Sequence, residues 1–536
     1  NGMDVFSTTI QPQEPGLYFY YFDLYTGYRK LYAGQLGEAY VTTGDGEAWQ
    51  LTVYEKDFQT PSHLRGGVIY QIFPDRFFES SPHATMPYAD RIYRPDKRSE
   101  PYFWPNEQHE GYLNMDYYGG DLPGIRKKLT YLASLGVTCI YLNPIFEAHA
   151  NHRYNTADYR KVDPVLGTNE DFAELCRAAK ARGIDVVLDG VFSHTGSDSV
   201  YFNREGRYAS FGAWQGPDSP YRRWYDFSPN YPHGYRCWWG FETLPEVNEE
   251  DRSYREFICG EGGVIDYWLG LGASGFRLDV ADELPDDFIE EIRRAVKRHG
   301  SEKYLLGEVW EDATNKWSYG RRRTYLLGKG LDAVMNYPLG QSIKDFWIDK
   351  SLTNEDFEYT INRCYTSYMQ QTNDVLFNLL DSHDTKRLRS DVKNLDEYFA
   401  QIAVLFAMPG SPCIYYGTEI AMEGSYDPDC RRCMPWSDIE AGKYAERSRI
   451  ISTLIHLRRQ EPLLKSRNFH FPNDYAAYRR VIQFQKVDFP DCYVEVLINC
   501  CEEDVEVVPQ GEILLERHYI DSTLLSNGIL IRRIRK

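Results

Sequence analysis

The chain has 536 residues, of which 42% are hydrophobic and 26% are charged, and its formal net charge is -19. This length indicates two to four domains with an ample core, and the composition is that of an ordinary soluble globular protein. The negative charge argues against nucleic acid or an acidic membrane as a partner, because a polyanion would be repelled. The negative charge does not argue against a neutral ligand. The aromatic content of 15% would suit stacking on sugar rings.

The eleven cysteines follow no repeated spacing. They predict reduced thiols in a cytoplasmic protein. Cys430 and Cys433 form a lone CxxC, and because no second ligand pair accompanies it, we expect no zinc site. No signal-peptide pattern stands at residues 1–10 and no apolar run reaches membrane-spanning length, so no membrane partner is expected. The start at Asn1 leaves export open.

The first part of the chain predicts a small β domain over residues 1–62, complete or partial. Residues 16–32 and 48–58 alternate aromatic and polar side chains, which is typical of β-hairpins. The segment 60–67 (TPSHLRGG) resembles a linker.

From Gly67 onward, short apolar runs alternate with longer helix-like stretches such as 124–136 and 169–183, the second with Asn169 as a candidate N-cap. Eight repeats of this pattern predict an α/β fold, a (β/α)₈ TIM barrel, and a doubly wound open sheet stays as the competing architecture. The eight expected strands are 68–73, 138–145, 184–191, 275–280, 304–310, 332–337, 375–382 and 412–417.

The connection that follows the third expected strand is too long for an ordinary barrel loop. It carries four tryptophans and many Tyr, Pro and Gly residues with little periodicity. We interpret residues 193–255 as an excursion domain that covers one end of the barrel. The barrel would then occupy 63–192 and 256–450, and alternating segments predict a C-terminal β-sandwich over 451–536.

Polar clusters stand where four of the expected strands end. Their members are Asp189 to His194, Arg277 with Asp279, Glu308, and Asp381 to Asp384. The carboxyl ends of barrel strands meet at one mouth, so these side chains should converge there. Several acids together with two histidines suit glycoside cleavage, which needs one carboxylate ionised and another protonated. Arg277 and Asp279 alone would also suit a structural ion pair.

These segments resemble the ordered sequence regions of the α-amylase family of glycoside hydrolases, from about Gly67 to Ser437. The matching motifs are DGVFSH (189–194), GFRLDVADE (275–283), GEVW (307–310) and LLDSHDT (379–385). Further motifs resemble the neopullulanase, cyclomaltodextrinase and maltogenic-amylase group. They are VIYQIFPDRF (68–77), YYGGDLPGI (117–125), NHRYNTADY (151–159), LPEVN (244–248) and GSPCIYYGTEI (410–420).

Two motifs depart from that group. LPEVN stands where the group usually has MPKLN, although Pro245 and Asn248 are kept, and Asp282 replaces the Asn of the VANE pattern. The resemblance therefore leaves the preferred glucan open.

The resemblance assigns roles to three acids. It implies that Asp279 is the nucleophile, that Glu308 is the acid and then the base, and that Asp384 grips sugar hydroxyls and stabilises the transition state. Arg277 would orient and ionise Asp279, while Asp189 would support Arg277. We expect the carboxyls of Asp279 and Glu308 to lie roughly 5 to 5.5 Å apart, with Glu308 holding the proton.

The remaining expected contacts are to sugar. The resemblance implies that His194 and His383 hydrogen-bond the sugar being cleaved, that Tyr154 stacks on it, and that His152 and Asn248 also bind substrate. A purely structural role for His152 or His194 is the competing interpretation.

The expected function is a retaining α-glucan hydrolase that cleaves α-1,4 bonds in α-glucan oligosaccharides. Cleavage of α-1,6 bonds in addition is left open. The alternatives are an α-glucanotransferase and a non-catalytic glucan-binding relative. We expect no required cofactor, and calcium is disfavoured because Ser193 replaces an Asn and the loop 77–88 has no acid cluster. A homodimer is a further hypothesis.

Overall fold

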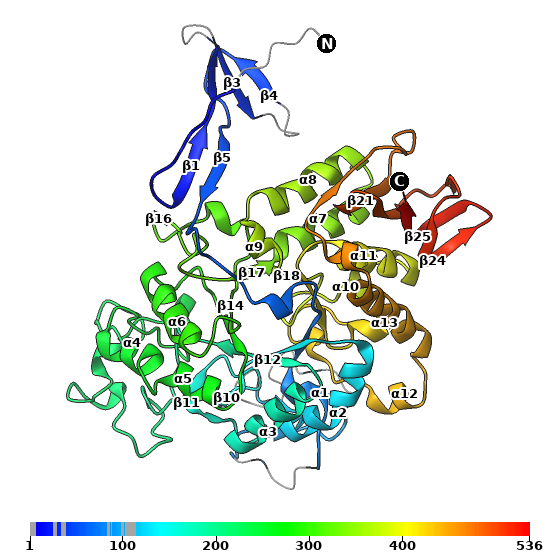
Figure 1. Cartoon of the computed structure of the whole chain (residues 1–536). Coiled ribbons are helices and arrows are strands. Elements are labelled where there is room, and N and C mark those ends of the chain that lie inside the picture. The colour runs from blue at the N-terminus through cyan, green and yellow to red at the C-terminus, as the bar shows by residue number, and fades with distance from the viewer. Residues whose placement is uncertain are drawn as a thin grey trace.

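The computed structural model describes residues 7–24, 29–33, 39–82, 86, 88–97, 101 and 114–535 (Figure 1). Part of the 77–88 loop and the first six residues therefore lie outside the described residues. Among the described residues, no helix is both long enough and apolar enough to cross a membrane.

Eight parallel strands close into a barrel in the order β12-β13-β14-β17-β18-β19-β6-β9. Seven of them lie within the runs expected from the sequence, and β19 begins at Ser411, one residue before its expected run. The closed barrel confirms the TIM barrel and excludes the open sheet. The strands are β6 (Ile69–Ile72), β9 (Cys139–Leu142), β12 (Asp185–Gly190), β13 (Gly275–Leu278), β14 (Tyr304–Gly307), β17 (Ala333–Asn336), β18 (Phe377–Asn378) and β19 (Ser411–Tyr415). They are almost wholly buried, because helices cover their outer face.

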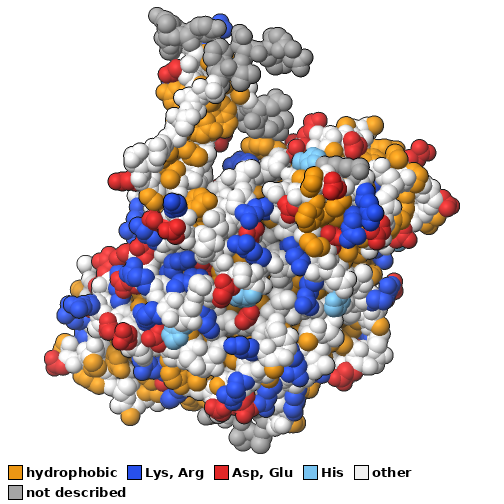
Figure 2. Space-filling model, viewed as in Figure 1, with side chains coloured by type: hydrophobic (Ala, Val, Ile, Leu, Met, Phe, Trp, Pro, Cys, Tyr) orange, Lys and Arg blue, Asp and Glu red, His pale blue; other side chains and the backbone are white. Residues whose placement is uncertain are grey.

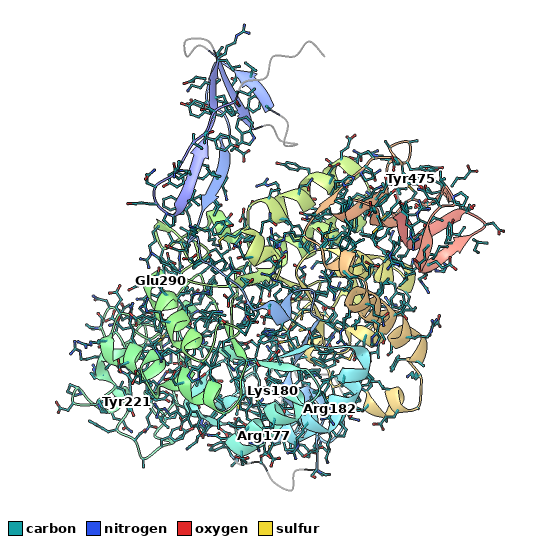
Figure 3. The ribbon with its side chains drawn as sticks, viewed as in Figure 1. Arg177, Lys180, Arg182, Tyr221, Glu290 and Tyr475 are labelled. Atoms are coloured by element: carbon teal, nitrogen blue, oxygen red, sulfur yellow. The ribbon has the colours of Figure 1, made fainter. Side chains whose placement is uncertain are left out.

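The helices around the barrel are amphipathic, as α3 (Asn169–Lys180) illustrates. Its Phe172 and Leu175 are buried, whereas Arg177 and Lys180 are exposed on the outer surface (Figure 3). Its N-cap is Thr168, which forms a capping box with Asp171, so the expected cap at Asn169 is one residue late.

The other helices follow the barrel strands. They are α1 (Pro74–Phe77), α2 (Leu122–Leu135), α4 (Arg252–Cys259), α5 (Val264–Gly270), α6 (Asp286–Arg298), α7 (Tyr337–Ile348), α8 (Asn354–Thr366), α9 (Gln370–Asn373), α10 (Leu388–Asp391), α11 (Leu395–Ala407), α12 (Trp436–Glu440) and α13 (Ala445–Gln460). Helix α13 contacts α2 and α11. The expected boundary between residues 450 and 451 thus falls inside a helix that packs on the barrel.

The N-terminal strands extend away from the barrel (Figure 1). Strand β1 (Gly16–Tyr20) pairs with β5 (Trp49–Val53), and β2 (Phe22–Leu24), β3 (Arg29–Ala33) and β4 (Ala39–Thr42) form a second small sheet. Hydrophobic side chains gather over these strands (Figure 2). The exposed aromatics among them are Tyr18, Phe19, Tyr20, Tyr21, Phe22 and Tyr40.

Residues 191–251 connect β12 to α4 with short 3-10 turns and isolated β-bridges, so the expected excursion segment, 193–255, ends inside α4. Their aromatic side chains form a core of their own, in which the ring of Phe202 lies 4.8 Å from that of Tyr225 and 4.7 Å from that of Tyr235. The bridge between His194 and Glu246 joins the beginning of the segment to its end.

The C-terminal part begins after α13 and is β-rich. Where two sheets of a sandwich were expected, the described strands form one connected six-stranded sheet, because the long β25 (Thr523–Arg535) pairs with three neighbours. The other strands are β20 (Phe469–His470), β21 (Val481–Phe489), β22 (Cys492–Asn499), β23 (Val505–Glu506) and β24 (Glu512–Ile520).

Candidate active site

One guanidinium joins three acids at the carboxyl ends of neighbouring barrel strands. Register pairs Asp189 of β12 with Arg277 of β13, so both side chains reach the same level of the barrel. Arg277 Nη1 donates to Asp189 Oδ1 and to Asp279 Oδ1, each over 2.7 Å, and Nη2 lies 2.8 Å from Glu308 Oε2. All four side chains are buried or nearly so, which makes these ion pairs strong and their disruption costly.

Asp189 is fully enclosed and has no open oxygen facing the cavity. Its Oδ2 accepts the hydroxyl protons of Tyr141 over 2.7 Å and of Tyr154 over 2.9 Å. With Arg277 on the other oxygen, this carboxylate is held by three donors. Its place is therefore behind Arg277, where it fixes the guanidinium.

The acid cluster carries more negative charge than one arginine can balance. Burial raises the pKa of Asp279 well above its ordinary value, Arg277 acts in the opposite direction, and the charge of Glu308 raises it further. Burial is the largest of these effects, so Asp279 resists ionisation. This differs from the expectation that Arg277 would keep Asp279 ionised.

Glu308 is held by donors on both oxygens. Val280 donates its backbone N–H to Oε2 over 2.8 Å, and Trp310 donates its indole N–H to Oε1 over 3.1 Å. The Trp310 ring stacks on Tyr337 with centroids 4.0 Å apart. Val280 has a φ of +40°, which is rare for a β-branched residue and stores backbone strain next to Asp279.

Asp384 is oriented by a histidine and an arginine. Its Oδ2 lies 2.9 Å from His383 Nε2, and its Oδ1 lies 3.2 Å from Arg431 Nη2. Burial alone would raise the pKa of Asp384, but His383 and Arg431 outweigh it and lower that pKa. Gln71 lies 2.9 Å from His383 Nδ1, so both ring nitrogens of this histidine are engaged inside the protein. His383 therefore positions Asp384.

His194 and His152 face the cavity as neutral rings. Burial lowers the pKa of His194 to about 4 and that of His152 to about 3. His194 Nδ1 lies 3.0 Å from the Ser193 hydroxyl, and its buried Nε2 has no hydrogen-bond partner among the described residues. His152 Nδ1 accepts the Tyr154 N–H over 3.0 Å. Each ring thus leaves Nε2 for a ligand.

A cavity of about 700 Å³ collects these groups. It is lined by Asp279, Glu308, Asp384, His152, Tyr154, His194 and Trp310, together with Trp238, Phe241 and Leu244 from the excursion segment. Asn248 is not brought to it. This residue is exposed, and its side chain accepts the Glu250 N–H over 3.2 Å, so its assignment as a substrate-binding residue is corrected to a turn-forming one.

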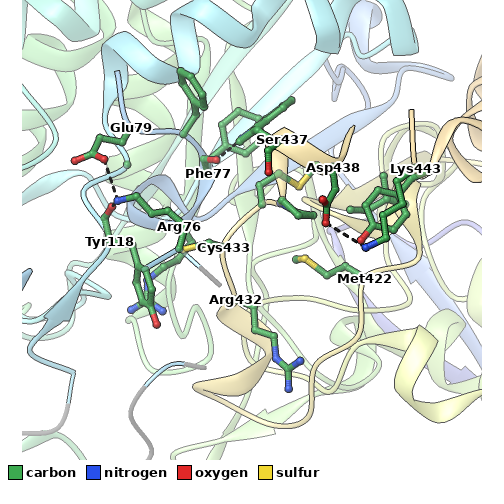
Figure 4. Close-up of a pocket in the computed structure, with 18 of the residues that line it drawn as sticks. Arg76, Phe77, Glu79, Tyr118, Met422, Arg432, Cys433, Ser437, Asp438 and Lys443 are labelled. Carbon is green, nitrogen blue, oxygen red and sulfur yellow. Dashed lines mark hydrogen bonds and ion pairs between the residues drawn. The ribbon is translucent and has the colours of Figure 1, made fainter. Parts of the chain in front are cut away.

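A second cavity, of about 740 Å³, lies between the loop after β6 and the segment before α13 (Figure 4). Phe77 and Trp436 line it, and Asp438 and Lys443 form an ion pair at its edge. None of the acids Asp279, Glu308 and Asp384 reaches it.

Several residues of the site were not predicted from the sequence. Gln71 could have been noticed as a polar residue in an apolar run, whereas Arg431 lies on no strand end and gave no signal. Asp198 and Glu205 also line the cavity, and burial raises the pKa of Asp198 to about 7. Arg207, 3.3 Å from Asp198, completes this polar wall.

Comparison with known proteins decides the family. The model of the α-amylase catalytic domain matches residues 71–486. The chain belongs to the α-amylase family. This confirms the resemblance, and the curated relatives include a cyclomaltodextrinase of a Bacillus species, 33% identical over 82% of this chain and 74% of that protein.

Other relatives of the family are longer. An amylopullulanase of Thermoanaerobacter thermohydrosulfuricus is 34% identical over 90% of this chain and 37% of that protein. The chain spans only 30 to 43% of the length of three such amylopullulanases. Among solved structures, the cyclic α-maltosyl-(1→6)-maltose hydrolase from Arthrobacter globiformis superposes with a TM-score of 0.74 and 27% identity, covering 89% of this chain and 100% of that one.

Proposed function

We propose that this α-amylase family member is a retaining hydrolase that cleaves α-1,4 bonds in α-glucan oligosaccharides. The observation that carries the proposal is the single guanidinium of Arg277, which gathers Asp189, Asp279 and Glu308 at three adjacent strand ends of one cavity. Retaining glycosidases use two carboxyls that flank the scissile bond, about 5 to 5.5 Å apart. The contacts of Asp279 and Glu308 with two nitrogens of one guanidinium support such a pairing.

The roles follow from the contacts. An oxygen of Asp279 attacks the anomeric carbon as the bond to the leaving oxygen breaks, and that oxygen takes the proton of Glu308. Glu308 then removes a proton from a water molecule, and the water oxygen attacks the anomeric carbon. The glycosyl ester bond breaks, and Asp279 leaves as a carboxylate. Asp384, kept ionised by His383 and Arg431, accepts hydrogen bonds from ring hydroxyls and stabilises the positive charge of the transition state.

The proton must sit on Glu308 for the first step. A sugar whose anomeric carbon becomes positive beside Asp279 favours the ionised form of that carboxyl, and so acts against the burial that raises its pKa. Neutral His194 and His152 present Nε2 to uncharged hydroxyls, which suits a sugar.

The substrate class is α-glucan, and the names of the relatives support this proposal. They include a cyclomaltodextrinase, a maltogenic amylase, neopullulanase 2 and amylopullulanases. Cleavage of α-1,6 bonds is part of the same proposal, supported by the neighbour named as a cyclic α-maltosyl-(1→6)-maltose hydrolase.

The test is a product profile on maltodextrins, γ-cyclodextrin and pullulan, with the anomer of the first product read by NMR. We expect shorter maltodextrins that first appear as the α-anomer, and no products from Glu308→Gln. Products that first appear as the β-anomer would overturn the retaining assignment, and normal rates in Glu308→Gln would overturn the role of Glu308.

A glucanotransferase is the second candidate, favoured by the burial of the site. Asp279 is 7% and Glu308 6% exposed, so a covalent intermediate would be sheltered from bulk water. Incubation with maltotriose separates the candidates: products longer than the substrate indicate transfer, and binding without products indicates a glucan-binding protein.

We infer that no calcium ion is required. The Ser193 hydroxyl is bonded to His194, and Asp75 at the start of the first barrel loop is paired with Arg76 over 2.7 Å and accepts the Tyr118 N–H over 3.0 Å. These oxygens are already engaged, so the donor set does not fit a cation that needs six to eight oxygens. Activity and Tm should be the same with and without EDTA; a loss restored by calcium would contradict this.

Two further proposals concern the oligomeric state and the cellular location of the protein. The exposed aromatics of the N-terminal strands support a homodimer, which a sedimentation experiment showing only monomer would exclude. Free thiols at all eleven cysteines and a relative named intracellular maltogenic amylase support a cytoplasmic location.

A further inference from the structure

Glu283, four residues after Asp279, binds two neighbouring indoles. Trp238 donates its Nε1–H to Glu283 Oε2 over 2.6 Å, and Trp239 donates its Nε1–H to Glu283 Oε1 over 2.8 Å. Both tryptophans belong to the excursion segment, so one carboxylate fastens that segment to the loop of the nucleophile. Hydrogen bonds to a carboxylate are stronger than neutral ones, and two of them fix the direction of both rings.

Two aromatic residues that interact with Glu283 are exposed on strained backbone. Trp239 is 77% exposed with a φ of +50°, and Tyr319 is 70% exposed with a φ of +52°. Burial and, after it, the charge of Glu283 and a hydrogen bond to it raise the pKa of Tyr319. A bulky residue with positive φ costs about 1 to 3 kcal/mol, and such strain persists where the surroundings impose it, often at binding sites. Ser318 donates its hydroxyl to the Asp282 carbonyl oxygen over 2.9 Å, which holds the turn before Tyr319 in place.

The aromatic rings are continuous with the active-site cavity. Trp238 lines that cavity, with its ring 5.0 Å from His194. From Trp238 the ring of Trp239 is 6.0 Å away, and that of Phe241, which is 57% exposed, is 6.1 Å away. These rings therefore lead from the cavity to the surface. Packing does not account for the exposed ones, since most of their area faces solvent.

We propose that Trp239 and Tyr319 form a platform on which glucose units remote from the cleaved bond stack, and that Glu283 is the positioning residue of this platform. The inference rests on the proposed function. A glucan chain is neutral and presents apolar ring faces, so it suits exposed aromatic rings that need no opposite charge. The platform selects substrates by length, because a short oligosaccharide bound across Asp279 and Glu308 does not reach it.

The test compares maltoheptaose with maltotriose. The ratio of their kcat/KM values should fall about three- to tenfold in Trp239→Ala, the range expected for one lost aromatic contact. In Glu283→Gln the amide cannot accept both indole protons, and the ratio should fall in the same direction, with the loss in the KM for maltoheptaose rather than in kcat. Phe489→Ala removes another exposed ring, 51% exposed, from the C-terminal sheet and should leave the ratio unchanged.

Binding provides the second measurement. In the Glu308→Gln background, calorimetry should show Kd for maltoheptaose raised about three- to tenfold by Trp239→Ala. An unchanged ratio and an unchanged Kd would overturn the platform while the hydrolase assignment stands. If the protein with intact acids cleaved no maltodextrin, the proposed function would fail, and the Kd comparison would still decide whether the platform binds glucan.

Discussion

Arg431 Nη2 lies 3.2 Å from Asp384 Oδ1, although the two residues are far apart in the chain. The same arginine donates from Nε to the His383 carbonyl oxygen over 2.9 Å. Arg431 thus supports both the charge and the position of Asp384.

Replacement of Arg431 by Lys should slow hydrolysis and change its pH dependence. A lysine cannot reproduce the forked contacts, and we expect kcat/KM to fall about 10²-fold. Ionised Asp384 is needed, and His383 and Arg431 lower its pKa. A lysine keeps the positive charge but not the close contact with Asp384, so that pKa should rise and move the acidic limb of the pH–rate profile to higher pH, by less than in Arg431→Gln, which removes the charge. Arg432→Lys, at a residue paired with Asp429, is the control. An acidic limb at the same pH in both variants would contradict this role.

Asp189→Asn should destabilise the fold. The amide keeps the size of the carboxyl but removes the charge that balances buried Arg277, and we expect a loss of about 3 kcal/mol in the free energy of unfolding, measured with urea. Asp185→Asn, at the half-exposed start of the same strand, should cost under about 1 kcal/mol. Equal losses in the two variants would show that Asp189 does not fix Arg277.

Asp279→Asn should abolish activity and yet stabilise the protein above pH 4. A carboxyl whose pKa is raised by folding lowers stability as pH rises from the unfolded pKa, near 3.9, through the folded pKa. The asparagine amide does not ionise, so the variant does not lose stability in this way. The Tm of the variant minus that of the parent should therefore grow as pH rises over this window. A variant less stable than the parent at every pH would contradict the burial argument.

Lys486→Met should also stabilise the protein. Lys486 is 0% exposed, its Nζ has no hydrogen-bond partner in the part of the chain that the structure describes, and burial lowers its pKa well below the ordinary value. Below the unfolded pKa of lysine, near 10.4, folding must bury or deprotonate this charged amine, which lowers the free energy of unfolding. Methionine removes that cost, so the free energy of unfolding should rise by roughly 1 to 4 kcal/mol at pH 7, and the rise should shrink toward pH 10. Lys350→Met, at an exposed lysine, should change stability by less than about 0.5 kcal/mol. A gain independent of pH would exclude the charge as its cause.

The sequence predicted the barrel because each strand is a short apolar run that is buried on both faces, and it predicted Asp279, Glu308 and Asp384 because they follow such runs. It did not predict Arg431, which reaches Asp384 from a short 3-10 helix, Asp429–Arg431, that follows no barrel strand. Asn248 was misplaced because a matching motif does not show which way a side chain turns, and here the side chain accepts the Glu250 N–H. The raised pKa of Asp279 depends on burial, which a sequence does not contain.

Glu283 gives the loop after β13 two attachments within five residues. Asp279 is bound to the barrel through Arg277, and Glu283 is bound to the excursion segment through two indoles. An insertion or deletion between them would displace the reacting carboxylate and the aromatic surface together. A change in the length of this loop would therefore move Asp279 as well as both indoles, whereas an exchange of a side chain at Trp239 would leave Asp279 in place.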